Sequence, residues 1–310
     1  MENNKSVVWP QGILISLIAL CGSLSLGLIM PTNQSHSEIQ RQSTINAIND
    51  TGVKTGTQRR LKQFKTAMLA SWQQQATLKG ISYTIPSRFQ GAIINQAKLP
   101  PTDKVIALTF DDGPWPDYTV KVLNVLRENN IKATFFVVGQ NLKNYPNLAK
   151  QVVADGHVIG NHTWHHWYHF FNQQAAAFEI DHTSELISQV TGAKTTLFRP
   201  PGGMLHNGLA SYAKNNKYTV VMWSADSVDY SRPNASALTS RVLKQAKPGG
   251  IVLMHDGGGN RSHTVAALPQ IIKKLKQQGY RFVTIPELLE LQDKNYNLIA
   301  NTKKQKQVAR

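Results

Sequence analysis

Cysteine is almost absent from this sequence, which excludes a fold held together by disulfides. Cys21 is the single cysteine among 310 residues, so no intrachain disulfide can form. Zinc ribbons, which need several cysteines, are excluded for the same reason. The fold must therefore rest on a hydrophobic core. With 41% hydrophobic residues, the chain is long enough for one globular domain plus extensions.

Acidic residues are also scarce. There are 18 Asp and Glu against 34 Lys and Arg, which gives a net charge of +16 and favours an anionic partner or surface. The sequence has no RNA-recognition aromatic motif and no basic recognition helix, so we expect no nucleic-acid partner. Much of the basic excess lies outside residues 101–292, and we interpret it as a solvated tether close to an anionic wall or lipid rather than a specific polyanion site. These residues are Arg59, Arg60, Lys62, Lys65, Lys303, Lys304, Lys306 and Arg310.

Charge is missing entirely from residues 12–30, which are nearly all apolar. This length is close to the ~20 residues that span a bilayer. A cleavable signal peptide is the alternative, but no A-x-A cleavage pattern follows the apolar run. We therefore predict that residues 1–30 form a short cytoplasmic tip and an uncleaved transmembrane helix. A polar stalk or linker is expected over residues 31–100.

From residue 104 onward, short apolar runs rich in β-forming residues alternate with helical patterns. This alternation predicts an α/β fold, a distorted (β/α) barrel of about seven strands. The predicted strands are 105–110, 133–138, 157–159, 196–198, 219–223, 251–254 and 281–285. The predicted helices are 119–128, 142–154, 175–189, 209–214, 235–245, 264–278 and 286–291.

Polar residues suited to catalysis follow several of these strands. The first strand runs into Asp111 and Asp112, two adjacent carboxylates that can be divided between a metal ion and general-base work. After the third strand come His162 and His166 in the motif HTWHH. If this segment is helical, the four-residue spacing places both imidazoles on one face, and a carboxylate from another strand would complete a 2-His-1-carboxylate metal site.

Three further strands end in conspicuous motifs. The fourth ends in FRPPGG with Arg199, the fifth in WSADSVDY, and the sixth in LMHD with His255. In a (β/α) barrel the carboxyl ends of the strands share one face, so all five motifs would line one pocket.

The ordered motifs TFDDGP, HTWHH, RPPGG, DSVDY and LMH resemble the polysaccharide deacetylases of the NodB-homology type, carbohydrate esterase family four. The resemblance covers residues 105–291 and implies a distorted barrel of fewer than eight strands. We accordingly predict a deacetylase domain over residues 101–292 and a basic tail over 293–310.

The resemblance also implies roles for individual residues. Asp111 would be the general base, and Asp112, His162 and His166 would hold one divalent metal ion, usually zinc and sometimes cobalt or another ion. His255 would be the general acid.

Supporting roles are implied in the same way. Arg199 would orient Asp111, the backbone N–H of Gly202 would stabilise the oxyanion, and Leu253 would line the pocket for the acetyl methyl group. Either Asp226 or Asp229 would tune His255, and we choose Asp229 because it directly precedes the aromatic position.

The sequence departs from the family pattern at two positions. Tyr230 stands where many members carry Trp, and Gly202 stands where many carry Tyr. The acetyl pocket is therefore expected to be roomier, or to be completed by Trp223 or Trp164.

The resemblance predicts an enzyme that removes N-acetyl groups from N-acetylglucosamine residues of a cell-envelope polysaccharide, with peptidoglycan as the expected polymer. A chitin-oligosaccharide deacetylase, an O-acetyl-xylan esterase and a non-catalytic wall-binding module are the alternatives. We expect a single-pass protein of a bacterial cytoplasmic membrane, with its catalytic domain on the extracytoplasmic side. The sequence indicates no oligomeric state.

Overall fold

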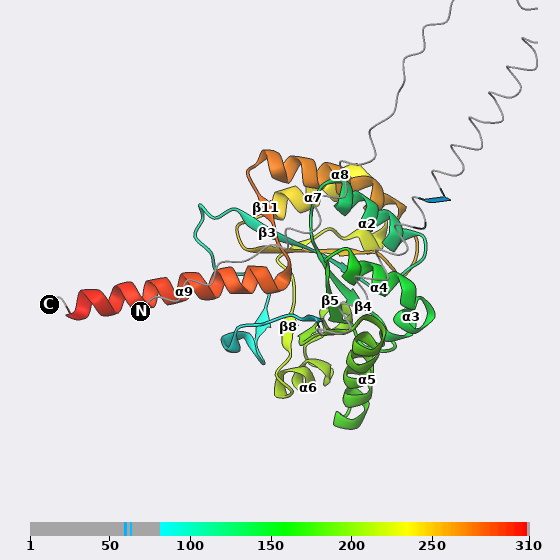
Figure 1. Ribbon diagram of the computed structural model, residues 1–310, viewed down its shortest axis with the longest axis horizontal. Coiled ribbons are helices and arrows are strands. Elements are labelled where there is room, and N and C mark those ends of the chain that lie inside the picture. Colours follow the sequence, from blue (N-terminus) through cyan, green and yellow to red (C-terminus); the bar gives the residue numbers. More distant parts are fainter. Residues whose placement is uncertain (1–58, 61–62, 64–80, 309–310) are drawn as a thin grey trace, which may run out of the picture. The chain divides into compact units, whose positions relative to one another are not determined.

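The computed structural model describes residues 59–60, 63 and 81–308 (Figure 1). The chain divides into two units, residues 1–62 and 63–310, and the following description concerns the second. The predicted membrane segment at residues 12–30 lies outside the described residues. Within the described part of the chain, no helix combines the length and the apolar character needed to cross a bilayer.

A curled sheet of parallel strands forms the centre of the fold. Each of the seven predicted runs contains a strand. These are β3 (Val105–Asp111), β4 (Thr134–Val137), β5 (Val158–Asn161), β7 (Leu197–Phe198), β8 (Thr219–Val221), β10 (Gly250–His255) and β11 (Arg281–Phe282).

The sheet has more strands than predicted. Two short strands, β2 (Ile93–Ile94) and β9 (Ala225–Asp226), bring it to nine among the described residues, in the order β2-β8-β7-β5-β4-β3-β10-β9 with β11 beside β3. Just after β2, Gln96 pairs with Gly250 at the start of β10. This bridge links the β2 edge to the other end of the sheet, so the strands curl into the expected distorted barrel.

Helices surround the barrel, and α2, α7 and α8 lie together on one side of it (Figure 1). They correspond to the predicted helices, except that the one expected at 142–154 is divided, because Tyr145 before Pro146 leaves the helical region (ψ 54°). The helices are α2 (Tyr118–Glu128), α3 (Gly139–Asn144), α4 (Pro146–Ala154), α5 (Gln173–Thr191), α6 (Leu209–Asn215), α7 (Ala235–Gln245), α8 (Ser262–Gln277) and α9 (Ile285–Val308).

Strand β3 is buried at all seven positions, and its two faces meet different parts of the core. Ile106, Leu108 and Phe110 pack in the cluster that includes side chains of α2, α4 and α8. Val105 and Ala107 pack in a second cluster with the start of α9. Because side chains alternate along a strand, Asp111 lies on the same face as Val105 and Ala107.

The folded domain begins earlier in the chain than residue 101. Ile85, Phe89 and Ala97 were assigned to the linker, but they are buried in the same core cluster as Val105 and Ala107. The Ala97 N–H donates to the carbonyl of Gly249 (2.8 Å), which fixes this segment against the start of β10. Residue 81 begins a strand too, since β1 (Ile81–Ser82) pairs with β6 (Ala193–Lys194).

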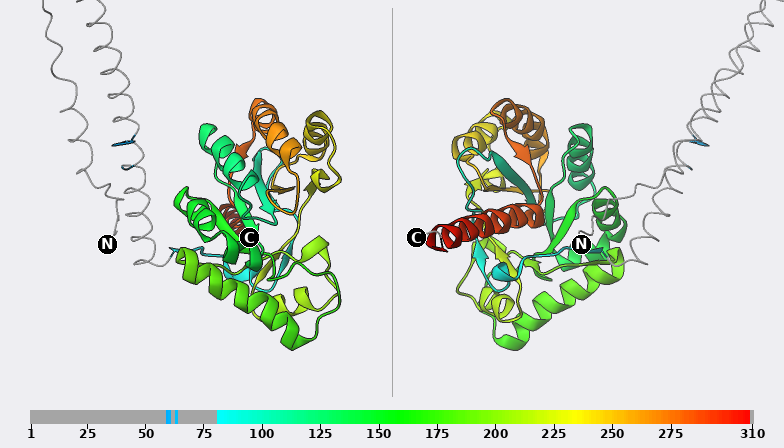
Figure 2. Two further views of the ribbon diagram at one scale, coloured as in Figure 1. Left: turned by 90° about the vertical axis from the view of Figure 1, so that its right-hand side faces the viewer. Right: turned by 60° about the vertical axis from the view of Figure 1, so that its left-hand side comes forward.

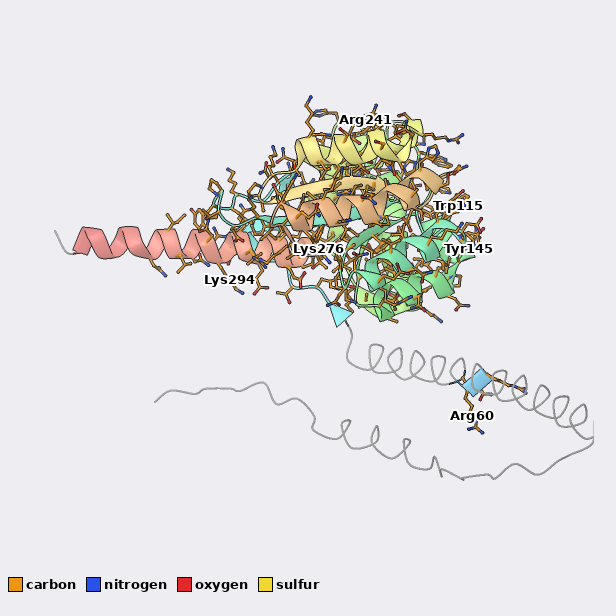
Figure 3. The ribbon with its side chains drawn as sticks, turned by 90° about the horizontal axis from the view of Figure 1, so that it is seen from above. Arg60, Trp115, Tyr145, Arg241, Lys276 and Lys294 are labelled. Carbon is orange, nitrogen blue, oxygen red and sulfur yellow. The ribbon has the colours of Figure 1, made fainter. Side chains whose placement is uncertain are left out.

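The segment expected to be a basic tail from residue 293 continues α9 without a break (Figure 2). Arg88 forms an ion pair with Asp293, and its guanidinium lies 4.1 Å from the ring centre of Tyr296. On the exposed surface of the same helix, Lys294 forms an ion pair with Glu290 at 2.7 Å (Figure 3). The helix is therefore attached to the domain through its first turns and through Arg88.

Candidate active site

All five sequence motifs meet at the carboxyl ends of the strands, where they line one cleft of about 600 Å³. Asp111 and His255 end β3 and β10 and are direct partners in the parallel register. Asp112 follows β3, and His162 follows β5. The cleft is lined by Asp111, Asp112, Val138, Gln140, Asn141, His162, His165, His166, Tyr168, Pro200, Gly202, Gly203, Trp223, Asp226, Tyr230, Leu253, His255, Gly258 and Arg261.

Asp112, His162 and His166 converge on one point, with one ligand atom of each lying within 4.8 Å of the others. Oδ1 of Asp112 lies 3.5 Å from Nε2 of His162 and 3.1 Å from Nε2 of His166. This oxygen is buried and has no hydrogen-bond partner. A buried polar atom without a partner is unfavourable unless an ion or water binds it, so the three residues fit a divalent metal ion.

The electrostatics of this cluster favour an ionised carboxylate. Burial alone would raise the pKa of Asp112, but contacts with His162 and His166, together with the charge of His255, hold this pKa well below its usual value. A negative carboxylate beside two imidazoles is the donor set that a 2-His-1-carboxylate site requires.

The two histidines lie in a loop, and the helical spacing proposed from the sequence is wrong. Thr163 (φ 67°) and His166 (φ 62°) both have left-handed backbone conformations. These turns bring the two imidazole rings to a centroid distance of 4.9 Å. His162 is oriented further by its Nδ1–H, which donates to the carbonyl of Arg199 at 2.7 Å and leaves Nε2 directed at Asp112.

Glu179 on α5 holds this loop in place. Its Oε2 accepts from the backbone N–H groups of Trp164 and His165, both at 2.9 Å, and its Oε1 accepts from Nδ1 of His165 at 2.5 Å. Glu179 is only 2% exposed. This role of Glu179 could not be predicted from the sequence, because a glutamate inside a long helix gives no signal of its distant partners.

Asp111 is held by a buried arginine. Nη1 of Arg199 donates to Oδ1 of Asp111 at 2.7 Å and to the hydroxyl of Thr109 at 2.8 Å, while Nε donates to the carbonyl of Val221 at 2.9 Å. Arg199 is 0% exposed. The other oxygen of Asp111, Oδ2, faces the group formed by Asp112, His162 and His166 and lies 3.7 Å from Nε2 of His162.

His255 pairs with Asp229. Its Nδ1 donates to Oδ1 of Asp229 at 2.6 Å, and Oδ2 accepts from the His255 N–H at 2.9 Å and from the Thr264 hydroxyl at 2.8 Å. Burial alone would lower the pKa of His255, but Asp229, with smaller contributions from Asp112 and Asp111, raises it to about 9.

The alternative partner, Asp226, bonds elsewhere. Its Oδ1 accepts from the N–H of Val228 at 2.7 Å, and its Oδ2 accepts from the hydroxyl of Tyr230 at 3.3 Å. Asp226 still lines the cleft.

Besides Glu179, Asp256 is a buried acid to which the sequence assigned no role. Asp256 is 1% exposed, and its Oδ2 accepts from the hydroxyl of Thr119 at 2.5 Å. Burial, reinforced by the charges of Asp112 and Asp111, raises the pKa of Asp256 to about 7. The same Thr119 hydroxyl accepts from the N–H of Trp115 at 2.7 Å, so this network fixes the turn that follows the two aspartates.

Of the residues expected around the acetyl group, Gly202, Leu253 and Trp223 line the cleft. Gly202 has φ 59°, a conformation that favours glycine. Trp164 does not complete the cleft. It packs inward, 4.4 Å from the ring of His182, and is 8% exposed.

Comparisons with known proteins agree with the motifs. The sequence profile of the family described as "Polysaccharide deacetylase" matches residues 98–221. A peptidoglycan-N-acetylglucosamine deacetylase of Bacillus cereus is 45% identical over 195 residues, which cover 62% of this chain and 91% of that protein. The peptidoglycan-N-acetylmuramic acid deacetylase PdaC of Bacillus subtilis is 36% identical over 192 residues, 62% of this chain and 40% of that protein.

The structure agrees with the sequence comparisons. The crystal structure of the Bc1960 peptidoglycan N-acetylglucosamine deacetylase superposes with a TM-score of 0.60 and 36% identity, covering 65% of this chain and 94% of that one. Sequence identity at this level indicates membership of the same family and not only a similar fold. The chain therefore belongs to the polysaccharide deacetylases of carbohydrate esterase family four, and it is a deacetylase of the hydrolase class.

Proposed function

We propose that this protein removes N-acetyl groups from N-acetylglucosamine residues of peptidoglycan in a reaction that depends on one divalent metal ion. The observation that carries the proposal is that one cleft is lined by Asp111 together with Asp112, His162 and His166. The buried Arg199 holds Asp111 in place. The B. cereus relative supports N-acetylglucosamine as the sugar.

Asp112, His162 and His166 would hold the ion, and zinc suits their nitrogen and oxygen donors, with cobalt as an alternative. A bound ion would polarise the acetamide carbonyl and lower the pKa of a water molecule.

Asp111 is placed to act as general base. Arg199 occupies its Oδ1 by a charge-assisted hydrogen bond, which fixes the carboxylate and leaves Oδ2 facing the metal cluster. Oδ2 would accept a proton from the water that attacks the carbonyl carbon.

His255 is placed to act as general acid. With a pKa raised to about 9, it is protonated at neutral pH. Asp229 holds Nδ1, so Nε2 is the ring nitrogen that remains for the leaving sugar amine. Transfer of the Nε2 proton to the sugar nitrogen lets the C–N bond break, and the products are acetate and a glucosamine residue.

The remaining wall of the cleft suits an acetyl group. The backbone N–H of Gly202 would stabilise the oxyanion, while Leu253 and Trp223 would contact the methyl group. Chitin oligosaccharides and O-acetylated xylan are alternative substrates with the same acyl group. A non-catalytic wall-binding module is disfavoured, because Asp111, His255 and the three proposed metal ligands all line the cleft, and the buried Arg199 and Asp229 contact Asp111 and His255.

Mass spectrometry of candidate polymers tests the proposal. The metal-loaded protein and its Asp111→Asn variant are incubated with peptidoglycan, chitin oligosaccharides and acetylated xylan. We expect peptidoglycan to lose acetyl groups with the appearance of free glucosamine amines, and the variant to be far slower. New amines only in chitin, or new hydroxyls only in xylan, would contradict peptidoglycan as the substrate.

We further propose that the catalytic domain acts outside a bacterial cytoplasmic membrane, anchored through residues 12–30. The support for this proposal is the uncharged apolar sequence of that segment. Cell fractionation should find the full chain with the membranes. Recovery of the intact chain in a membrane-free cytosolic fraction would contradict the anchor.

A further inference from the structure

The loop after His166 carries aromatic rings in two alternating rows. In the first row, the ring of His165 stacks on Trp167 (3.9 Å between centroids), Trp167 meets His169 (5.3 Å), and His169 stacks on Phe171 (4.3 Å). These residues are two apart in sequence, as in an extended segment whose alternate side chains lie on opposite faces. Each of these rings contacts the next, so the four form one continuous row.

The stack is fixed at both ends. At one end Glu179 binds His165, as described above. At the other end Phe171 is 3% exposed, and its N–H donates to the carbonyl of Asn207 at 2.8 Å. The loop is therefore held in one conformation by buried partners.

The second row contains His166, Tyr168 and Phe170. It begins at the proposed metal ligand His166 and continues into Tyr168 and Phe170, which line a different hollow. The rings of His166 and Tyr168 meet edge to face at 5.2 Å. Tyr168 also covers Gly202, since a Cβ at Gly202 would lie 2.8 Å from Cε1 of Tyr168. Tyr168 is 55% exposed and Phe170 is 74% exposed, which is unusual for large apolar side chains beside a cleft.

These exposed rings line a second hollow of about 530 Å³. It is formed by Tyr168, Phe170, Gly202, Gly203, Met204, Leu205, His206 and Asn207. Three of these residues, Tyr168, Gly202 and Gly203, also line the catalytic cleft, so the two hollows adjoin. A hollow of this size with exposed apolar rings has the character of a ligand site.

We infer that this hollow is a subsite for a sugar ring next to the one that is deacetylated, with Tyr168 and Phe170 as its stacking surface. The inference rests on the proposed function, since it assumes a polysaccharide in the adjoining cleft. A pyranose ring has an apolar C–H face that packs on an aromatic ring, while its hydroxyls reach polar groups such as His206 at the rim. Because the hollow shares three lining residues with the catalytic cleft, the same polymer is favoured as its occupant.

The test compares the binding of short and long β-linked N-acetylglucosamine oligomers. Affinities for the dimer and the hexamer are measured by calorimetry on the metal-loaded protein, with Asp111→Asn present in every variant to slow turnover. Phe170→Ala is compared with Phe170→Trp, which keeps an aromatic ring, and with Tyr296→Ala, which removes an exposed ring on α9 away from both hollows.

We expect the hexamer to bind more tightly than the dimer, and Phe170→Ala to weaken hexamer binding by about 3- to 10-fold. Phe170→Trp should bind the hexamer more tightly than the dimer, as the parent protein does. Tyr296→Ala should have the same affinities for both oligomers as the parent protein. If Phe170→Ala keeps the full advantage of the hexamer, the subsite is overturned. If the parent binds neither oligomer, the subsite is overturned as well.

Acetate release by the protein with Asp111 intact separates the two proposals. If no substrate is deacetylated but the length dependence is lost in Phe170→Ala, the proposed function fails and the subsite stands. Sedimentation with anionic phospholipid vesicles tests another occupant. If Phe170→Ala weakens vesicle binding and leaves oligomer affinities unchanged, the aromatic row contacts lipid and the subsite is overturned.

Discussion

At the level of single residues, the adjacent Asp111 and Asp112 contact different partners. Asp111 lies on the face of β3 that points into the barrel and is held by Arg199. Asp112 lies one residue beyond, at φ 72°, where the chain turns its carboxylate toward the two histidines. Adjacent residues in sequence thus reach different partners.

Substitution should separate these roles. Asp111→Asn should retain the metal and lose about 10² to 10⁴ in rate, because a positioned base is lost. Asp112→Asn should lose both activity and metal affinity, because a metal ligand is lost. Metal content measured beside turnover checks both variants. The opposite pattern, with metal lost only from Asp111→Asn, would exchange the roles.

The pairing of His255 with Asp229 predicts a change in pH dependence. Because Asp229 raises the pKa of His255 to about 9, the acid stays protonated up to that pH and activity should fall as pH rises through it. Asp229→Asn removes the negative charge and lowers this pKa, so the alkaline limb should move to lower pH. The matched control is Asp226→Asn. An equal movement of the limb in the control would show that the pairing is not responsible.

At the scale of elements, the metal site depends on a loop that is held from α5. Glu179 accepts three hydrogen bonds from that loop while almost fully buried. Two residues of the loop have left-handed backbone angles, and such strained conformations persist only when neighbouring groups hold them.

Glu179→Ala should therefore weaken metal binding by about 10- to 100-fold, in the range seen when outer partners of metal ligands are removed. Unpaired buried N–H groups should also lower the free energy of unfolding by about 1–3 kcal/mol for each group left without a partner. Glu185→Ala, an exposed glutamate on the same helix, is the control. Wild-type metal affinity in Glu179→Ala would contradict this role.

At the scale of the whole molecule, the sequence predicted what depends on local pattern. The long apolar runs gave β3, β4 and β10, and the motif order gave the family. The short strands β2 and β9 were missed. β2 lies in the segment assigned to the linker, and β9 follows directly after the predicted run 219–223, so neither stood out as a separate apolar run. The roles of Glu179 and of the aromatic residues after His166 were also missed. Their contacts form only in the folded chain, so no local sequence pattern indicates them.

Removal and restoration of the metal ion would show whether this deacetylase depends on it. The protein is stripped with a chelator, its metal content is measured, and zinc is added back while acetate release from peptidoglycan is followed. We predict no activity without metal, and recovery that is complete at one zinc ion per chain, because the structure offers one cluster of three ligands among the described residues. Full activity in protein with no measurable metal would contradict the account.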